Sequence, residues 1–185
     1  MMVSRRRQLV DNRTMEQNRY GSCTDELIRT GIKRHIDWLN AEIKDTDDDI
    51  DQQIKVMPLW QEKVKLLEEV KGIGRTTLAV LLSMLPELGQ LNRCKISALV
   101  GVCPYAHDSG KMKGKRCIWG GRSAVRAALY MAAMSAVRYN PTIQAFFEKL
   151  RSKGKAFKVA MTACVRKLVT ILNAMVRDNK KWAAA

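Results

Sequence analysis

Cysteine pairs, histidine and aromatic residues are all scarce in this chain of 185 residues. It has two histidines, 6% aromatic residues and five cysteines, and no two cysteines stand in a Cys-x-x-Cys spacing. Zinc sites are built from closely spaced cysteine and histidine ligands, so the sequence excludes a pattern of this kind. The odd cysteine count favours reduced thiols over a disulfide framework. We therefore predict neither a metal site nor a cofactor within this chain.

Long apolar runs are also missing. The first ten residues contain three arginines with no apolar run behind them, which excludes a secretory signal peptide. No stretch of about 18 residues is free of charge, so we predict no membrane-spanning segment and no membrane partner. These absences favour a cytoplasmic location.

Acidic residues are rare over the last two-thirds of the chain. Residues 1–70 hold 12 basic and 14 acidic side chains, whereas residues 71–185 hold 21 and 4, so the net charge of +15 arises after residue 70. Such a surplus attracts polyanions, and nucleic acid is the commonest of them. Anionic lipid is the alternative, but the sequence has no amphipathic anchor with an aromatic belt. The length suits one domain with an appendage.

Isoleucine recurs in the N-terminal third. An apolar seam with a spacing of seven, filled in at offsets of three and four, is formed by Ile32, Ile36, Leu39, Ile43, Ile50, Ile54 and Met57. Residues 23–62 are therefore predicted to form a helical coiled-coil arm that packs against a helix of the same or a second chain. The acid run 45–51 lacks the glycine and the closing glutamate of an EF-hand, so it is a solvated helix face or a turn between two shorter helices. Pro58 is predicted to end or kink the arm.

A Gly-Ile-Gly turn separates two predicted helices, 60–70 and one that starts at Thr76. The arrangement resembles the helix-hairpin-helix DNA-binding motif, in which N–H groups at the start of the second helix face a phosphate. A simple turn between helices is the alternative. The nucleic-acid contacts predicted here are Lys71, Gly72, Gly74, Arg75 and Thr76.

A glycine-rich basic loop follows, from residue 100 to residue 126. Its single acid, Asp108, is followed directly by Ser109. The cations predicted to contact phosphates are Lys111, Lys113, Lys115, Arg116, Arg122 and Arg126. A solvated basic loop is the alternative, but apolar helical segments on both sides favour a phosphate-handling site. Residues 112–119 are the one candidate for a short β-hairpin, and Ser123 is interpreted as part of a helix cap.

The predicted fold is mainly α. Further helices are expected over residues 95–100, 122–138 and 157–177, and over one that starts at Asn140-Pro141 and ends at Gly154. The architecture is thus a long helical coiled-coil arm followed by a helical domain that contains the helix-hairpin-helix-like motif and the glycine-rich basic loop.

Four segments resemble a known family. They are KGIGRTTLAVLLSMLPELGQL, ALVGVCPYAHDSGKMKGKR, GGRSAVRAALYMAAMSAVRYNP and KVAMTACVRKLVTILNAMVRD. In order, over residues 5–177, the chain resembles the C-terminal half of the IS one-ten family of insertion-sequence transposases. In that family an RNase H-like domain with four metal-binding acids precedes a helical arm and a C-terminal domain with a serine in a D-S-G context. By this resemblance, residues 1–22 are a remnant of the RNase H-like domain and residues 63–185 are the C-terminal transposase domain.

The resemblance implies DNA transposition through a serine. Ser109 is then the nucleophile for strand cleavage and exchange, and DNA and a structured guide (bridge) RNA are the partners. It also implies a homo-oligomer that associates through the arm, Mg²⁺ in the missing N-terminal domain, and a prokaryotic, nucleoid-associated protein. Asp108 either orients a cation or the hydroxyl, or caps a turn, and His107 is a candidate base. The alternatives are a non-catalytic nucleic-acid-binding module and a truncated transposase remnant.

Overall fold

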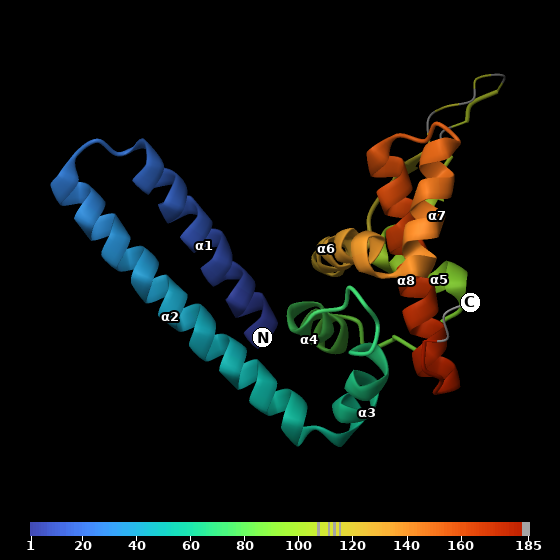
Figure 1. Cartoon of the computed structure of the whole chain (residues 1–185), viewed down its shortest axis with the longest axis horizontal. Coiled ribbons are helices and arrows are strands. Elements are labelled where there is room, and N and C mark those ends of the chain that lie inside the picture. Colours follow the sequence, from blue (N-terminus) through green and yellow to red (C-terminus); the bar gives the residue numbers. More distant parts are fainter. Residues whose placement is uncertain (107, 111, 113, 115, 183–185) are drawn as a thin grey trace. The chain divides into compact units, whose positions relative to one another are not determined.

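The computed structural model describes residues 1–106, 108–110, 112, 114 and 116–182. Most of these residues are helical, and two short strands form the only sheet among them (Figure 1). The prediction of a mainly α fold is confirmed. The chain divides into two compact units, Met1–Pro58 and Leu59–Ala185, which are described in turn.

The first unit is a hairpin of two antiparallel helices, α1 (Met2–Ser22) and α2 (Glu26–Val56) (Figure 1). The Asp25 carboxylate begins α2 by accepting hydrogen bonds from the backbone N–H groups of the next turn, which satisfies donors that a helix start leaves unpaired. Leu39 and Ile43 of α2 are buried with Leu9 of α1, and Val10 packs against this cluster. Part of the predicted seam thus finds its partner within the same chain.

The acid run of α2 lies on one continuous helix, so the alternative of a turn within residues 45–51 is wrong. Arg6 of α1 donates from Nη2 to Asp47 at 2.9 Å, which compensates one charge of the run. Met57 departs from the predicted seam, since it is the C-cap residue of α2 and is 41% exposed. The cause is Pro58, whose ring disfavours a helical conformation at the preceding residue.

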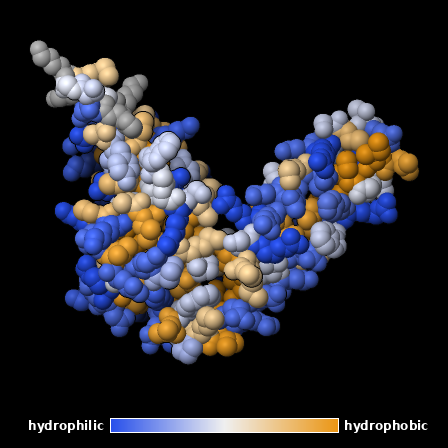
Figure 2. Space-filling model, turned by 180° about the vertical axis from the view of Figure 1, so that it is seen from behind, coloured by the Kyte–Doolittle hydropathy of each residue, from blue (hydrophilic) through white to orange (hydrophobic). Residues whose placement is uncertain are grey.

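An apolar patch occupies the end of the first unit where α1 and α2 are joined. Figure 2 shows it as apolar surface at the far end of this hairpin. Leu27 and Ile28, in the first turn of α2, are 85% and 55% exposed. Leu27 and Ile28 therefore lie outside the buried seam of this unit.

The second unit is a cluster of helices packed around α6. Its helices are α3 (Pro58–Leu67), α4 (Arg75–Met84), α5 (Arg93–Val100), α6 (Ser123–Tyr139), α7 (Pro141–Ser152) and α8 (Phe157–Asp178). Helix α6 packs against α4, α5, α7 and α8. Its buried face includes Ala132, Ala133 and Ala136, whose small side chains allow the neighbouring helices to approach closely.

The two predicted caps in this unit have different outcomes. Asn140 accepts hydrogen bonds from the backbone N–H groups of Thr142 and Ile143, and Pro141 is the first residue of α7, as predicted. Ser123 is not a cap. The N-cap position of α6 is Arg122, which makes no side-chain capping bond, and Ser123 is the first helical residue.

Helix α8 is long and apolar enough, by length and composition alone, to cross a membrane. The sequence predicts no membrane span because no stretch of about 18 residues is free of charge, and this helix contains Arg166 and Lys167. Half of its apolar stretch is buried, and α5, α6 and α7 pack against it. In this structure it is a core helix of the second unit.

Candidate serine hairpin and nucleic-acid interface

Ser109 lies at the tip of a β-hairpin. Strand β1 (Pro104–Tyr105) pairs in antiparallel fashion with β2 (Cys117–Ile118), so that Tyr105 lies opposite Cys117. Closer to the tip, the backbones of Ser109 and Met112 exchange two N–H···O=C hydrogen bonds of 3.0 Å. The predicted hairpin within residues 112–119 is therefore wrong in extent, because its first strand, β1, comes from before the serine.

The serine side chain is exposed, and no hydrogen bond joins its hydroxyl to another described residue. Gly110, directly after it, has φ +57°, a conformation that glycine adopts without strain. Asp108 accepts a hydrogen bond at 3.0 Å from the backbone N–H of Gly114. The carboxylate thus caps the turn from inside the hairpin. His107 lies outside the described residues.

Two glycines form the base of the hairpin, where the chain leaves α5 and enters α6. A Cβ atom at Gly121 would lie 2.3 Å from the Gly101 nitrogen and 2.5 Å from its Cα. A Cβ atom at Gly101 would lie 2.2 Å from the Gly120 carbonyl oxygen. Both residues also have positive φ, so side chains are excluded here by space and by conformation. The two chain segments cross with no room between their backbones.

Two arginines from the start of α6 hold this crossing. Arg126 donates from Nη1 to the carbonyl oxygen of Gly120 at 2.6 Å. Arg122 donates from Nη1 and Nη2 to the two carboxylate oxygens of Glu87, both at 2.6 Å, and from Nη1 to the Met84 carbonyl at 2.9 Å. These bonds lower the pKa of Glu87 below its ordinary value and raise that of Arg122. The base of the hairpin is therefore tied to the ends of α4 and α5.

The structure places the predicted phosphate-contacting cations in two different settings. Arg122 and Arg126 both have partners within the second unit, so their guanidinium groups are engaged at the base of the hairpin. Arg116 is exposed on the returning arm, one residue before β2. Three further predicted contacts, Lys111, Lys113 and Lys115, lie outside the described residues. Contact with nucleic acid stays a prediction for all six.

The Gly-Ile-Gly turn connects α3 to α4. Gly72 has φ +107°, and a Cβ atom there would lie 2.7 Å from the backbone nitrogen of Ala136 in α6. Gly74 is the N-cap residue of α4 and has open space around it. Lys71 is exposed directly before the turn, and Arg75 and Thr76 are exposed in the first turn of α4. The first glycine of the turn allows close packing on α6, and phosphate binding here stays a prediction.

Among the described residues, no three histidine, cysteine or acidic side chains come together in a group that would hold a metal ion. Asp108 is the only acid of the hairpin, and its carboxylate already accepts a backbone hydrogen bond. The Mg²⁺ that the resemblance implies concerns another domain, and it stays a prediction.

Sequence reasoning missed Glu87 as the partner of Arg122. One signal was available, because Glu87 is one of only four acids after residue 70. An acid that stands alone in so basic a segment is a natural partner for a structural arginine. The pairing itself joins residues 35 positions apart, so only the fold brings them together.

Comparison with known proteins gives a consistent result. Residues 64–148, which include the Gly-Ile-Gly turn and the serine hairpin, match the family described as Transposase IS116/IS110/IS902 family. The chain is 32% identical over 185 residues to the pilin gene-inverting proteins of Moraxella lacunata and Moraxella bovis, with 96% of this chain and 55% of each relative covered. It is 24% identical over 161 residues to the insertion element IS110 uncharacterized 43.6 kDa protein of Streptomyces coelicolor, with 86% of this chain and 39% of the relative covered.

A further relative is the insertion element IS900 uncharacterized 42 kDa protein of Mycobacterium paratuberculosis, 26% identical over 160 residues, with 83% of this chain and 38% of the relative covered. The chain thus spans about half the length of the pilin gene-inverting proteins and less of the insertion-element proteins. The names of the insertion-element relatives agree with the transposase family that residues 64–148 match. Residues 64–148 therefore match the IS116/IS110/IS902 family of transposases, and the relatives extend the similarity over most of the chain.

Proposed function

We propose that this chain binds DNA and supplies Ser109 as the nucleophile for strand cleavage and exchange in DNA transposition. The observation that carries the proposal is the setting of the serine, exposed at the tip of a hairpin whose base is fixed by the Gly101–Gly121 crossing. A nucleophile must reach the phosphorus atom of a DNA strand, and an exposed tip allows this. It must also hold its position, which a rigid base provides.

The reaction is a transesterification. The Ser109 oxygen forms a bond to phosphorus, the bond from phosphorus to one deoxyribose oxygen breaks, and the released oxygen takes a proton. The serine proton passes to a base, because a neutral hydroxyl is a weak nucleophile at neutral pH. The resulting phosphoserine ester keeps the bond energy, so a hydroxyl of another strand can reverse the step and join the strands. On this proposal Arg116, which is exposed on the returning arm, stabilises negative charge on the phosphate.

The family and the charge distribution support DNA as the partner. Residues 71–185 carry 21 basic and 4 acidic side chains, which favours binding through phosphates. A structured guide RNA, association of two chains through the arm, and a cytoplasmic, nucleoid-associated location are parts of the same proposal and rest on the resemblance. Mg²⁺ belongs, on this proposal, to an acid-bearing domain outside this chain.

Trapping of a covalent protein–DNA adduct on denaturing gels, followed by peptide mapping, tests the nucleophile. In a complete transposase that contains this sequence, Ser109→Ala should abolish the adduct and strand exchange, while DNA binding stays within about twofold because no charge changes. Ser123→Ala is the matched control: it removes a hydroxyl without a capping bond and should keep the adduct. An adduct that survives in Ser109→Ala, or maps to another residue, would refute the proposal and favour a non-catalytic nucleic-acid-binding module.

A further inference from the structure

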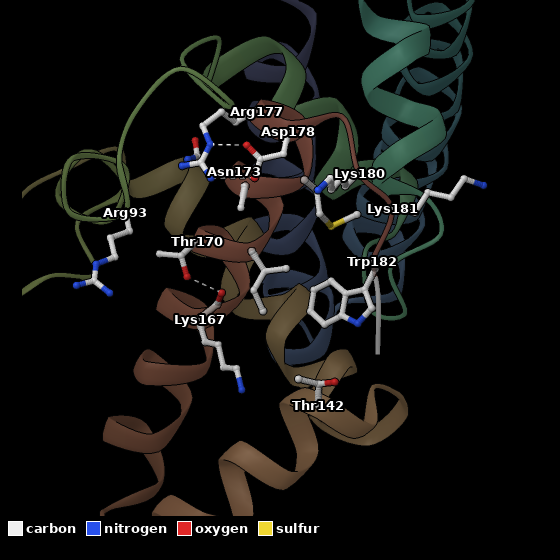
Figure 3. Close-up of a pocket in the computed structure, with 13 residues that line it drawn as sticks. Arg93, Thr142, Lys167, Thr170, Asn173, Arg177, Asp178, Lys180, Lys181 and Trp182 are labelled. Atoms are coloured by element: carbon white, nitrogen blue, oxygen red, sulfur yellow. Dashed lines mark hydrogen bonds and ion pairs between the residues drawn. The ribbon is translucent and has the colours of Figure 1, made fainter. Parts of the chain in front are cut away.

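A pocket of about 580 Å³ opens beside the C-terminal half of α8 in the second unit (Figure 3). Its lining comes from four places in the chain: Arg93 at the start of α5, Thr142 at the start of α7, Lys167 and Thr170 in α8, and Trp182 after α8. A volume of this size suits a small ligand. None of the lining residues belongs to the serine hairpin, so the pocket is a separate site.

The lining of the pocket carries more positive than negative charge. Five cations and one carboxylate line it: Arg93, Lys167, Arg177, Lys180, Lys181 and Asp178. Asp178 accepts hydrogen bonds from Arg177 at 2.7 and 2.9 Å, and Lys181 pairs with Glu69 at 2.5 Å. In the described part of the chain, neither Arg93 nor Lys180 forms a salt bridge, although the charge of Lys180 contributes to lowering the pKa of Asp178. The pocket therefore attracts an anion, and phosphate is an anion that both arginine and lysine bind.

An aromatic ring forms part of the wall. Trp182 is partly buried although it lies beyond the last helix. Before it, the Lys180 N–H donates to the Met175 carbonyl at 3.0 Å, with Asn179 in the left-handed conformation at φ +49°. Beside it, Lys181 is anchored to Glu69. These contacts position the indole, which in the view of Figure 3 lies across the pocket from Arg93, with Thr170 between them.

The rest of the pocket lining combines apolar side chains, a hydroxyl and a further cation. Ile171, Ala174 and Met175 contribute apolar surface, and Thr142 contributes a hydroxyl. Lys167 holds its ammonium 4.6 Å from the centre of the Phe146 ring, a cation–π contact that fixes the position of the charge. A site for inorganic phosphate alone needs no apolar wall and no indole. Charge, hydroxyl and aromatic surface together match a nucleotide, which has a phosphate, a sugar and a flat base.

We propose that this pocket binds one nucleotide of an unpaired nucleic-acid strand. Arg93 contacts the phosphate, Lys167 and Lys180 add charge, and the base stacks on Trp182. The strand must be unpaired because stacking on a side chain requires a base that has left its duplex neighbours. The proposal rests on the proposed nucleic-acid binding, but it adds a second contact point that is independent of Ser109.

Fluorescence anisotropy with the 185-residue chain tests it, with labelled oligothymidine and oligouridine strands of about eight nucleotides as probes, against a duplex of equal length. Trp182→Ala should weaken binding of the unpaired strands about fivefold or more, and Trp182→Phe should restore part of it. The thymidine and uridine probes separate DNA from RNA as the source of the strand. Duplex binding should change little in Trp182→Ala, and inorganic phosphate should compete poorly.

Lys158→Gln is the matched control for the loss of charge. Lys158 is exposed at the other end of α8 and does not line the pocket. Lys167→Gln and Arg93→Gln should each weaken binding of the unpaired strand clearly more than Lys158→Gln does. Thermal unfolding by circular dichroism checks that each variant is folded.

The outcomes separate the two proposals. If the chain binds DNA but pocket variants and Lys158→Gln behave alike, or if duplex binding depends equally on Trp182, the pocket proposal is refuted and the proposed function stands. If phosphate alone displaces the strands, the site is an anion site and the nucleotide assignment is wrong. If no nucleic acid binds at all, both proposals fail.

Discussion

Arg122 and Glu87 form a two-pronged ion pair, in which each terminal guanidinium nitrogen lies 2.6 Å from one carboxylate oxygen. The pair joins the N-cap residue of α6 to the segment after α4, at the base of the serine hairpin. Arg122 also donates to the Met84 carbonyl, the last residue of α4. A cation predicted to meet DNA thus has a structural role at the base of the hairpin.

The Arg122–Glu87 pair should make stability depend on pH. Because the pKa of Glu87 is lowered in the folded chain, its contribution is present above the ordinary value of 4.5 and is lost as the pH falls through the lower, folded value. The difference in unfolding free energy between wild type and Glu87→Gln should be less than about 1 kcal/mol at neutral pH, because both side chains are about a third exposed. This difference should shrink towards zero as the pH falls below the lowered pKa of Glu87. Urea unfolding at a series of pH values measures it.

Arg122→Lys is the matched variant for this prediction. Lysine keeps the charge but cannot bind both carboxylate oxygens in the same fork. The pH-dependent difference should therefore be reduced and not abolished. A difference that grows on acidification would mean that the pair does not stabilise the fold.

The crossing at Gly121 should tolerate no side chain. Gly121→Ala places a Cβ atom 2.3 Å from a backbone nitrogen, so the loss of stability should be roughly 3 kcal/mol, from strain and overpacking together. Gly120→Ala is the control, because Gly120 also has positive φ but has open space around it. It should lose only about 1 kcal/mol, the conformational part. Equal losses in chemical denaturation would show that the close approach is unimportant.

Asp108 should act through the hairpin turn. Asp108→Ala removes the acceptor of the Gly114 N–H, so this amide should exchange with solvent faster in NMR hydrogen-exchange measurements. Asp108→Asn keeps an oxygen acceptor and should preserve both the protection and the Ser109 adduct. Loss of the adduct in Asp108→Asn with the hairpin intact would instead assign the carboxylate a direct part in the chemistry.

The seam of the first unit should be sensitive to charge. Ile43→Asp places an unpaired carboxylate among Leu9 and Leu39, and should cost about 3 kcal/mol or more, with loss of helical circular dichroism. Ile28→Asp, at an exposed position on the same helix, should change stability by no more than about 0.5 kcal/mol. Sedimentation of both variants separates the two roles: if Ile28→Asp weakens self-association while its helices persist, the exposed patch is where a second chain binds.

Local signals in the sequence were sufficient for most of the helical fold. Asn140 followed by Pro141 marks the start of α7 because an amide oxygen and a fixed φ satisfy needs that arise within one turn. Pro58 marks the end of α2 for an equally local steric reason. Leu39 and Ile43 indicated a buried face through their spacing, although the spacing did not say which helix would cover it.

Contacts between distant residues were decided only by the tertiary structure. The sequence placed Ser109 in a glycine-rich basic loop, but the strand that pairs with β2 begins before the serine, and no local pattern indicates that register. The position of Ser123 after Gly-Gly-Arg at a helix start predicted a cap, whereas in the structure Arg122 is the N-cap residue and Ser123 is the first helical residue.

For the charged residues too, the sequence determined one part and the tertiary structure decided the other. The sequence by itself determined that positive charge gathers after residue 70, since net charge is a sum over residues. It did not determine which cations face solvent. Arg122 is paired with Glu87, whereas Arg93 lines an open pocket with Trp182, because the partner of a charged side chain depends on where the folded chain brings distant residues.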